Sequence, residues 1–271
     1  MTFNLTKKDL YIMGIVNFTP DSFYDGGKYK SVDDALKSVE LMIEQGVDII
    51  DIGGESSRPG SKRISIQQEI DRVAPVVSKV RENFDIPISV DTMKPELLEV
   101  LIPYNVNMVN DISSLSNPGL INIIKDNDMY ICIMHMQKNP EEMQINPAYN
   151  DVNDDVTQYL DDKMNFCISN GISREKIIID PGFGFGKTLD HNYSLLNNLD
   201  RLLNINQNIL VGISRKSMIG NLLNKDVNDR LYGSLAATVI SIINKAKIIR
   251  THDVRETKIA ADLTQSIIGA T

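Results

Sequence analysis

The sequence has 271 residues, enough for one large hydrophobic core, and an α/β barrel of this length is normally a single domain. Its net charge of -8 and sequence pI near 5.0, with no basic stripe, disfavour a nucleic-acid-binding surface. No apolar run approaches the length of a membrane span, and residues 1–8 lack the apolar core of a signal peptide. We therefore expect a soluble, cytoplasmic enzyme or binding protein that forms one domain over residues 1–271, with no membrane or nucleic-acid partner.

Short apolar runs alternate with longer amphipathic segments along the whole chain. The apolar runs are rich in Ile and Val, which is typical of buried parallel strands. We expect strands at residues 11–16, 47–52, 86–90, 106–109, 129–134, 177–179, 209–213 and 247–249. We expect helices at residues 32–43 (capped by Ser31), 66–80, 95–101, 152–169, 191–203 and 228–245 (with a break near Lys225), and a last helix that ends near residue 268.

Eight strand-then-helix units with no linker between them predict a single closed (β/α)8 barrel of parallel strands, in the α/β class. An open, doubly wound sheet is the alternative, but eight consecutive alternations favour closure. Cys132 and Cys167 lie in apolar runs without metal-type spacing, so we expect both to be buried free thiols.

Most expected strands end in a residue that can ionise or form directional hydrogen bonds. The carboxyl ends of barrel strands converge on one pocket, so these residues are expected to meet there. Any one of them alone has the alternative role of a helix cap or a turn residue. The residues are Asn17, Asp51, Asp91, Asn110, His135, Asp180, Lys216, Arg250 and His252.

The types of these residues indicate the kind of ligand. Asp91, Asn110 and Asp180 offer many acceptors, which suit a flat heterocycle with adjacent N–H and NH2 groups. Lys216 would donate to a carbonyl or ring nitrogen of the same heterocycle.

A second set suits an anionic group such as a diphosphate: the cations Arg58, Arg250 and His252, together with Asn17. A solvated loop arginine is the alternative for Arg58. Phe23 and Phe185 lie in glycine-rich loops, where they are either minor packing residues or a cover for an aromatic substrate.

The segment from Gly182 to Thr188 ends in Gly-Lys-Thr, like a phosphate-binding loop. Position 181, where the first glycine of that motif would stand, is Pro, and the spacing does not fit a dinucleotide-binding motif either. We therefore do not predict a nucleotide site there.

Five segments of the chain together resemble the signature segments of the dihydropteroate synthase family, in the expected order. They are residues 13–23, 51–60, 180–187, 214–217 and 250–254. The resemblance implies a TIM barrel, usually dimeric, and a role in folate biosynthesis as a target of sulfonamides. It implies the condensation of 7,8-dihydropterin-6-ylmethyl diphosphate with 4-aminobenzoate, which gives 7,8-dihydropteroate and pyrophosphate.

The resemblance also implies a role for each matching residue. Asp91, Asn110, Asp180 and Lys216 would hold the pterin, with Met134 packed on it. Asn17, Arg250 and His252 would bind the diphosphate, with Asn17 a ligand of Mg2+ as cofactor. The residues around 4-aminobenzoate would be Phe23, Ser57, Arg58, Pro59, Phe185 and Ser214.

The family's reaction is dissociative, so diphosphate leaves before the arylamine attacks a pterin methylene cation. Catalysis would then rest on Asp91, Asp180, Lys216 and Arg250, with no side-chain nucleophile. One departure is Ser57, which stands where many members have Thr, and this leaves the discrimination between aminobenzoate and sulfonamides open. A pterin-dependent methyltransferase-like barrel and a non-catalytic pterin-binding protein are the alternative functions.

Overall fold

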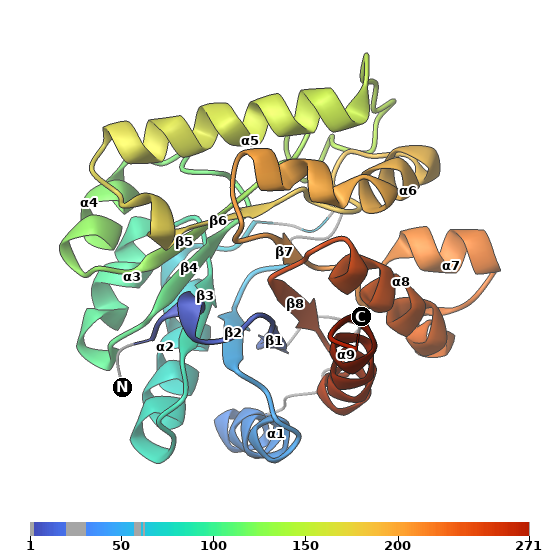
Figure 1. Cartoon of the computed structure of the whole chain (residues 1–271). Coiled ribbons are helices and arrows are strands. Elements are labelled where there is room, and N and C mark those ends of the chain that lie inside the picture. Colours follow the sequence, from blue (N-terminus) through green and yellow to red (C-terminus); the bar gives the residue numbers. More distant parts are fainter. Residues whose placement is uncertain (1–2, 20–30, 57–60, 62, 271) are drawn as a thin grey trace.

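Eight parallel strands form the centre of the protein. The computed structural model describes residues 3–19, 31–56, 61 and 63–270 (Figure 1). The order in the sheet is β6-β5-β4-β3-β2-β1-β8-β7, and a parallel bridge between Ile179 and Ile209 joins its two outer strands and closes the barrel. The strands are β1 (Tyr11–Asn17), β2 (Ile49–Gly53), β3 (Ile88–Asp91), β4 (Met108–Asp111), β5 (Tyr130–Met134), β6 (Ile177–Asp180), β7 (Leu210–Val211) and β8 (Ile248–Thr251). The expected (β/α)8 barrel is confirmed.

Helices surround this barrel (Figure 1). They are α1 (Val32–Glu44), α2 (Ile66–Asn83), α3 (Pro95–Leu101), α4 (Gly119–Asp126), α5 (Val152–Ser169), α6 (Leu189–Asn197), α7 (Ser217–Leu223), α8 (Leu231–Ile243) and α9 (Val254–Ile268). The Ser31 hydroxyl accepts a hydrogen bond from the Asp34 amide at 3.2 Å, so the predicted cap of α1 is confirmed.

The helices differ from the prediction at three places, although the break expected near Lys225 is present, between α7 and α8. Helix α4 was not expected, because Pro118 and Gly119 at its start are typical of turns, and no side chain caps it. The helix expected at residues 191–203 ends at Asn197 and continues as a 3-10 helix, Leu199–Asn204. The stretch expected at residues 228–245 begins only at Leu231, and a separate helix, α7, precedes it.

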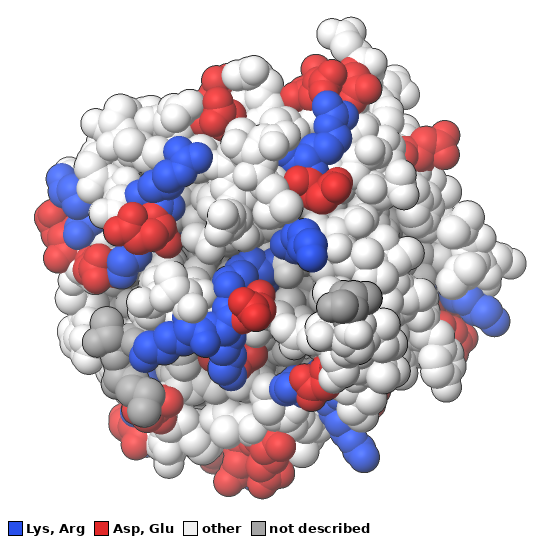
Figure 2. Space-filling view, in the orientation of Figure 1, with Lys and Arg blue, Asp and Glu red and all other residues white. Residues whose placement is uncertain are grey.

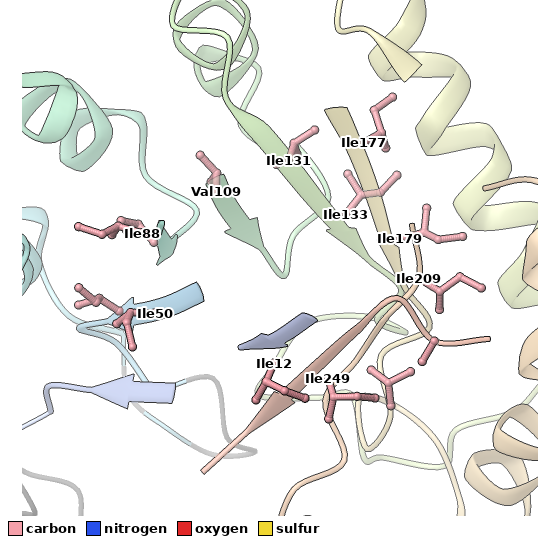
Figure 3. Packing of buried hydrophobic residues seen from close by; sticks show 14 of the residues in the cluster. Ile12, Ile50, Ile88, Val109, Ile131, Ile133, Ile177, Ile179, Ile209 and Ile249 are labelled. Carbon is pink, nitrogen blue, oxygen red and sulfur yellow. The ribbon is translucent and has the colours of Figure 1, made fainter. Parts of the chain in front are cut away.

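Alternate residues of each strand pack on opposite sides of the barrel wall. The outward side chains form a continuous apolar layer under the helices, as Figure 3 shows for Ile12, Ile50, Val109 and Ile131 among others. The inward side chains of one barrel end form a second, separate apolar cluster: Tyr11, Met13, Ile49, Met108, Tyr130, Cys132, Ile178, Leu210 and Ile248, with Leu5. Cys132 and Cys167 are buried and unpaired, as expected.

The amino-terminal segment closes the barrel end that this second cluster fills. Leu5 is almost fully buried, and its amide donates to the Tyr130 hydroxyl at 3.3 Å. The Phe3 ring meets the Tyr130 ring edge-on, with centroids 5.1 Å apart. Because this end is apolar and covered, the charged inward residues lie toward the carboxyl ends of the strands, and the buried Ser89 of β3 is a polar exception within the apolar layer.

Positive and negative side chains are interspersed on the face shown in Figure 2, without a stripe of one sign. None of the helices within the described ranges has both the length and the apolar character needed to cross a membrane.

Candidate active site

The inward positions that follow the apolar cluster carry polar side chains. On β2, β3 and β4, Asp51, Asp91 and Asn110 continue the inward series, and the ladders pair Gly53 with Asp91 and Asp91 with Asn110. The alternation that buries the apolar residues therefore also brings these side chains to one end of the barrel.

Arg250 at the end of β8 joins two carboxylates across the barrel. Its Nε lies 2.7 Å from Asp51 Oδ2, and its Nη2 lies 2.9 Å from Asp91 Oδ2. Asn110 Nδ2 donates to the same Asp51 oxygen at 3.3 Å. Asp51 is fully buried, and no donor among the described residues reaches its Oδ1. Acceptors and cations are thus in direct contact here, rather than on separate sides of the pocket.

Burial sets the protonation of these groups. It raises the pKa of Asp91 to about 7; the Arg250 guanidinium opposes this rise, and the Asp51 carboxylate adds to it. Burial alone would lower the pKa of Arg250, but Asp51 and Asp91 outweigh it and raise that pKa. Arg250 therefore stays cationic, while Asp91 can exchange a proton near neutral pH.

Asp180 and Lys216 form a second polar pair at the same barrel end. Asp180 Oδ1 accepts a hydrogen bond from the Gly182 amide at 2.7 Å, and its pKa is raised by burial, against the influence of Lys216. Lys216 Nζ donates to Phe183 O at 2.5 Å and lies 4.7 Å from the centroid of the Phe185 ring. Burial lowers the pKa of Lys216 to about 8.

Ser214 and His252 lie together beside this pair. Ser214 Oγ accepts a hydrogen bond from the His252 amide at 3.2 Å and lies 3.1 Å from its Nδ1. The neighbouring Arg215 forms two hydrogen bonds with Asp253, at 2.8 and 2.6 Å. This bidentate pair ties the loop after β7 to the end of β8 and so holds Ser214 and His252 in place.

Asn17 and Met134 end their strands near the same carboxylates. A Cβ atom on Gly53 would lie 3.2 Å from Asp91 Cβ and 3.6 Å from Asn17 Oδ1, so the glycine lets these two side chains approach each other. Met134 is buried and pairs with Asp180 in the β5–β6 ladder.

An open cleft with about 390 Å3 of empty space lies beside Asp91, and Glu55, Arg63, Thr92 and Pro140 are among the residues that line it. Over the described part of the chain, no group of three His, Cys, Asp or Glu residues could hold a metal ion.

His135 does not join the other strand ends, which corrects the expectation. Met134 points inward, so the next residue points out of the barrel, and the His135 ring packs against Tyr149, Tyr159 and the Lys187 amine. The predicted residues Phe23, Ser57, Arg58 and Pro59 lie outside the described residues.

Asp51 received no specific role from the sequence, although it is the partner that holds Arg250. The signal was a single carboxylate within the apolar run Ile49-Ile50-Asp51-Ile52, since a charge buried at that depth requires a partner.

The chain is similar to known proteins along almost its whole length. The model of the family "Pterin binding enzyme" matches residues 13–252. The dihydropteroate synthase of Escherichia coli (strain K12) is 47% identical over 260 residues, which cover 96% of this chain and 92% of that protein.

Solved structures are similar as well. The Yersinia pestis dihydropteroate synthase, in a complex with a sulfonamide drug, superposes with a TM-score of 0.94 at 42% identity, over 99% of this chain and 97% of that one. A Xanthomonas albilineans dihydropteroate synthase with 4-aminobenzoic acid superposes with a TM-score of 0.88 at 36% identity, over 96% and 93% of the two chains.

Proposed function

This chain belongs to the pterin binding enzyme family, as a dihydropteroate synthase, and we propose how its own residues carry out the reaction. The reaction condenses 7,8-dihydropterin-6-ylmethyl diphosphate with 4-aminobenzoate and gives 7,8-dihydropteroate and pyrophosphate, as a step of folate biosynthesis. We assign the roles from one observation. At the carboxyl ends of the strands, Arg250 contacts Asp51 and Asp91, and Asn110 contacts Asp51.

The pterin lies in this pocket. Asp91, Asn110 and Asp180 accept hydrogen bonds from its N–H groups, and Lys216 donates to its carbonyl or ring nitrogen. Met134, buried opposite Asp180 in the ladder, packs on the pterin ring. Support comes from the burial of Asp180, since a carboxylate with so little water around it requires a partner with several donors.

The diphosphate lies toward Asn17, Arg250 and His252. The donor set fits Mg2+ as cofactor, because this ion takes oxygen ligands and commonly keeps several waters, with only one or two protein ligands beside substrate phosphates. The Asn17 amide oxygen would be such a ligand. Bound Mg2+ supplies neutralisation of the charge that develops on the leaving diphosphate.

The substitution is dissociative. The bond between the pterin methylene carbon and the bridging oxygen breaks, and its electron pair leaves with the diphosphate, which Arg250 and His252 hold. Asp91 and Asp180 stabilise the positive charge that spreads over the pterin ring. The aminobenzoate nitrogen then forms the C–N bond, and its extra proton passes to solvent.

Aminobenzoate lies at the outer side of the pterin. Phe185, which lies against the Lys216 ammonium, and Ser214 border its site, and we assign Phe23, Ser57, Arg58 and Pro59 to the same site. Ser57 in place of the more common Thr bears on how well the site distinguishes aminobenzoate from sulfonamides.

A three-component assay tests the reaction. Pyrophosphate release should require the pterin diphosphate, 4-aminobenzoate and Mg2+ together. A non-catalytic pterin-binding protein would bind the pterin without release, and a methyltransferase-like barrel would release no pyrophosphate.

An isotope experiment tests the order of bond breaking. The bridging oxygen of the pterin diphosphate is labelled with oxygen-18, and aminobenzoate is replaced by benzoate, which cannot attack. Movement of the label into non-bridging positions is expected if the C–O bond breaks first; a label that stays in the bridge would contradict the dissociative step.

The active form is a homodimer that pairs through α8 and α9. These two helices pack side by side, and the surface over α8 carries few charged side chains (Figures 1 and 2). Ile259, Leu263 and Ile267 follow at four-residue steps on α9, each more than 60% exposed. Exposed Tyr232, Ile240 and Ile243 continue the apolar surface on α8. We also place the enzyme in the cytoplasm, and its two unpaired cysteines suit that reducing compartment.

A further inference from the structure

The loop between β6 and α6 has an unusual pattern of hydrogen bonds. Each of its five consecutive carbonyl groups, from Gly182 to Gly186, accepts a hydrogen bond from a side chain. The donors are Lys187 to Gly182 at 2.9 Å and to Phe185 at 3.1 Å, Lys216 to Phe183 at 2.5 Å, Gln144 to Gly184 at 2.5 Å, and Tyr149 to Gly186 at 2.6 Å. The loop is therefore held in one conformation by Lys187, which directly follows it, and by groups from two other parts of the fold: the segment between β5 and α5, and the segment after β7.

Lys187 makes the largest share of these contacts. Its side chain is buried, and its Nζ also lies 2.9 Å from His135 Nδ1 and 3.3 Å from His135 O. Burial, together with the nearby Lys216 charge, lowers the pKa of this amine well below its ordinary value, against the influence of Asp180. His135 suits the role of acceptor, because burial and the neighbouring Lys187 lower the pKa of its ring to about 2 and leave it neutral.

The backbone of the loop adopts a conformation that places the Gly182 and Phe185 carbonyls at this amine. Gly182, Gly184 and Gly186 have φ values of +68°, +81° and +65°, which side-chain-bearing residues rarely adopt. The Lys-Thr ending that resembles a phosphate-binding loop thus has a different use here: the lysine points into the protein and binds its own loop.

Two residues, Phe185 and Lys216, connect the loop held by Lys187 to the proposed substrate site. Phe185 has its carbonyl held by Lys187 and its ring 4.7 Å from Lys216 Nζ. Lys216 in turn bonds Phe183 of the same loop. A loop that shifts would move the ring and the ammonium together.

We propose that Lys187 is a positioning residue of the reaction. It ties the Gly182–Gly186 loop to His135 at the end of β5, and so holds Phe185 and Lys216 in the geometry that receives aminobenzoate. The inference rests on the proposed place of aminobenzoate beside Phe185.

The test compares Lys187→Met with the unaltered enzyme. The variant keeps the apolar stem but removes all four polar contacts. We expect the KM for aminobenzoate to rise by about tenfold or more, because a shift of about 1 Å in a positioning group has effects of this size. The dissociation constant of the pterin diphosphate should rise less than this KM, because the shift disturbs its Lys216 contact while Asp91, Asn110 and Asp180 stay fixed in the strand ladders.

Hydrogen exchange gives a readout that does not depend on activity. The amides of residues 182–186 should exchange faster in Lys187→Met. Lys138→Met is the matched control, because Lys138 is an exposed lysine of the adjoining segment with one backbone contact, to Ile145 O at 3.0 Å. It should leave both readouts unchanged. If Lys187→Met does not fold, Lys187→Gln, which retains an amide donor, takes its place with a smaller effect in the same direction.

Two results would distinguish a failure of the inference about Lys187 from a failure of the proposed aminobenzoate site. Unchanged aminobenzoate KM and unchanged exchange in the folded Lys187 variant would overturn the inference. A Phe185→Ala variant with normal aminobenzoate KM would instead show that the substrate lies elsewhere, and the exchange measurement would still decide whether Lys187 anchors the loop.

Discussion

Arg250 is surrounded by more negative charge than it can neutralise. Its guanidinium contacts two carboxylates, Asp51 and Asp91, and its single positive charge cannot balance both when both are ionised. In a buried pocket this excess favours a ligand that becomes positive. The proposed pterin cation would meet a site that is already arranged for it.

Removal of the Asp51 carboxylate should be costly for folding. In Asp51→Ala the partly buried Arg250 keeps only one of its two carboxylate partners and Asn110 Nδ2 loses its acceptor, and such a loss of hydrogen bonds to a charged group typically costs about 1–3 kcal/mol. Urea unfolding measures it. As the control, Asp262→Ala breaks the exposed pair with Lys258 and should cost no more than about 0.5 kcal/mol. Equal midpoints for the two variants would contradict the bracing role of Asp51.

The pH dependence of catalysis should follow Lys216. Its pKa is lowered to about 8, so its ammonium is present below that pH and is lost above it. If Lys216 must donate to the pterin as a cation, kcat/KM should fall as pH rises through about 8. Lys216→Arg stays charged over this range and should lack the fall, at lower absolute activity. An identical alkaline fall in both enzymes would assign it to another group.

Single residues could be predicted where they directly follow an apolar run. Asp91, Asp180 and Arg250 were found this way, because the strand places its last inward residue in the pocket. His135 was misplaced because it stands one position later, and one step along a strand reverses the direction of the side chain. The contact between Arg250 and two carboxylates joins residues far apart in the chain, so no local pattern could indicate it.

At the level of elements, the sequence predicted which segments become strands better than where they begin. Val47 was expected in β2, but its amide bonds Met42 O at 3.0 Å and so still belongs to the end of α1. The expected strand at residues 209–213 is reduced to Leu210–Val211, because the polar segment after it turns to form the Ser214–His252 contact. Hydrophobicity reports burial, and burial extends past the hydrogen-bonded ladder on both sides.

The close packing of the loop after β6 can be tested by substitution of Gly182. A Cβ atom there would lie 1.9 Å from His135 O, and the φ of +68° adds strain, so Gly182→Ala must displace the chain. We expect a loss of stability of more than about 3 kcal/mol and a loss of kcat/KM of at least about 100-fold.

Gly171→Ala is the matched control for this prediction. Its φ is +92°, but the nearest atom to an added Cβ is the flexible Lys125 Cδ at 3.3 Å. It should cost about 1–2 kcal/mol and leave kcat/KM unchanged. Thermal unfolding and steady-state kinetics measure both variants, and similar behaviour of the two would show that close packing at Gly182 is unimportant.

For the whole molecule, the alternation of strands and helices was sufficient to predict a closed barrel. It could not predict how the barrel closes, since the closure is an isolated bridge between Ile179 of β6 and Ile209, the residue before β7. Nor could it locate the exposed apolar faces of α8 and α9, because in sequence they resemble the apolar faces that pack on the barrel.

The proposed dimer predicts a clear effect of one charge on α9. Leu263→Asp should convert the protein from dimer to monomer in sedimentation experiments, because a carboxylate in the centre of an apolar interface has no partner. Ile145→Asp introduces the same charge at a similarly exposed site elsewhere and should leave the dimer intact. A Leu263→Asp protein that remains dimeric would place the interface on another face.

The second apolar cluster fills one end of the barrel, and the amino-terminal segment with Phe3 and Leu5 covers it. The pocket is therefore closed at that end. Substrates and products must therefore enter and leave at the carboxyl ends of the strands. In the proposed arrangement the pterin lies deeper than aminobenzoate, so the pterin diphosphate is expected to bind before aminobenzoate. Aminobenzoate that binds first would block the entry of the pterin diphosphate.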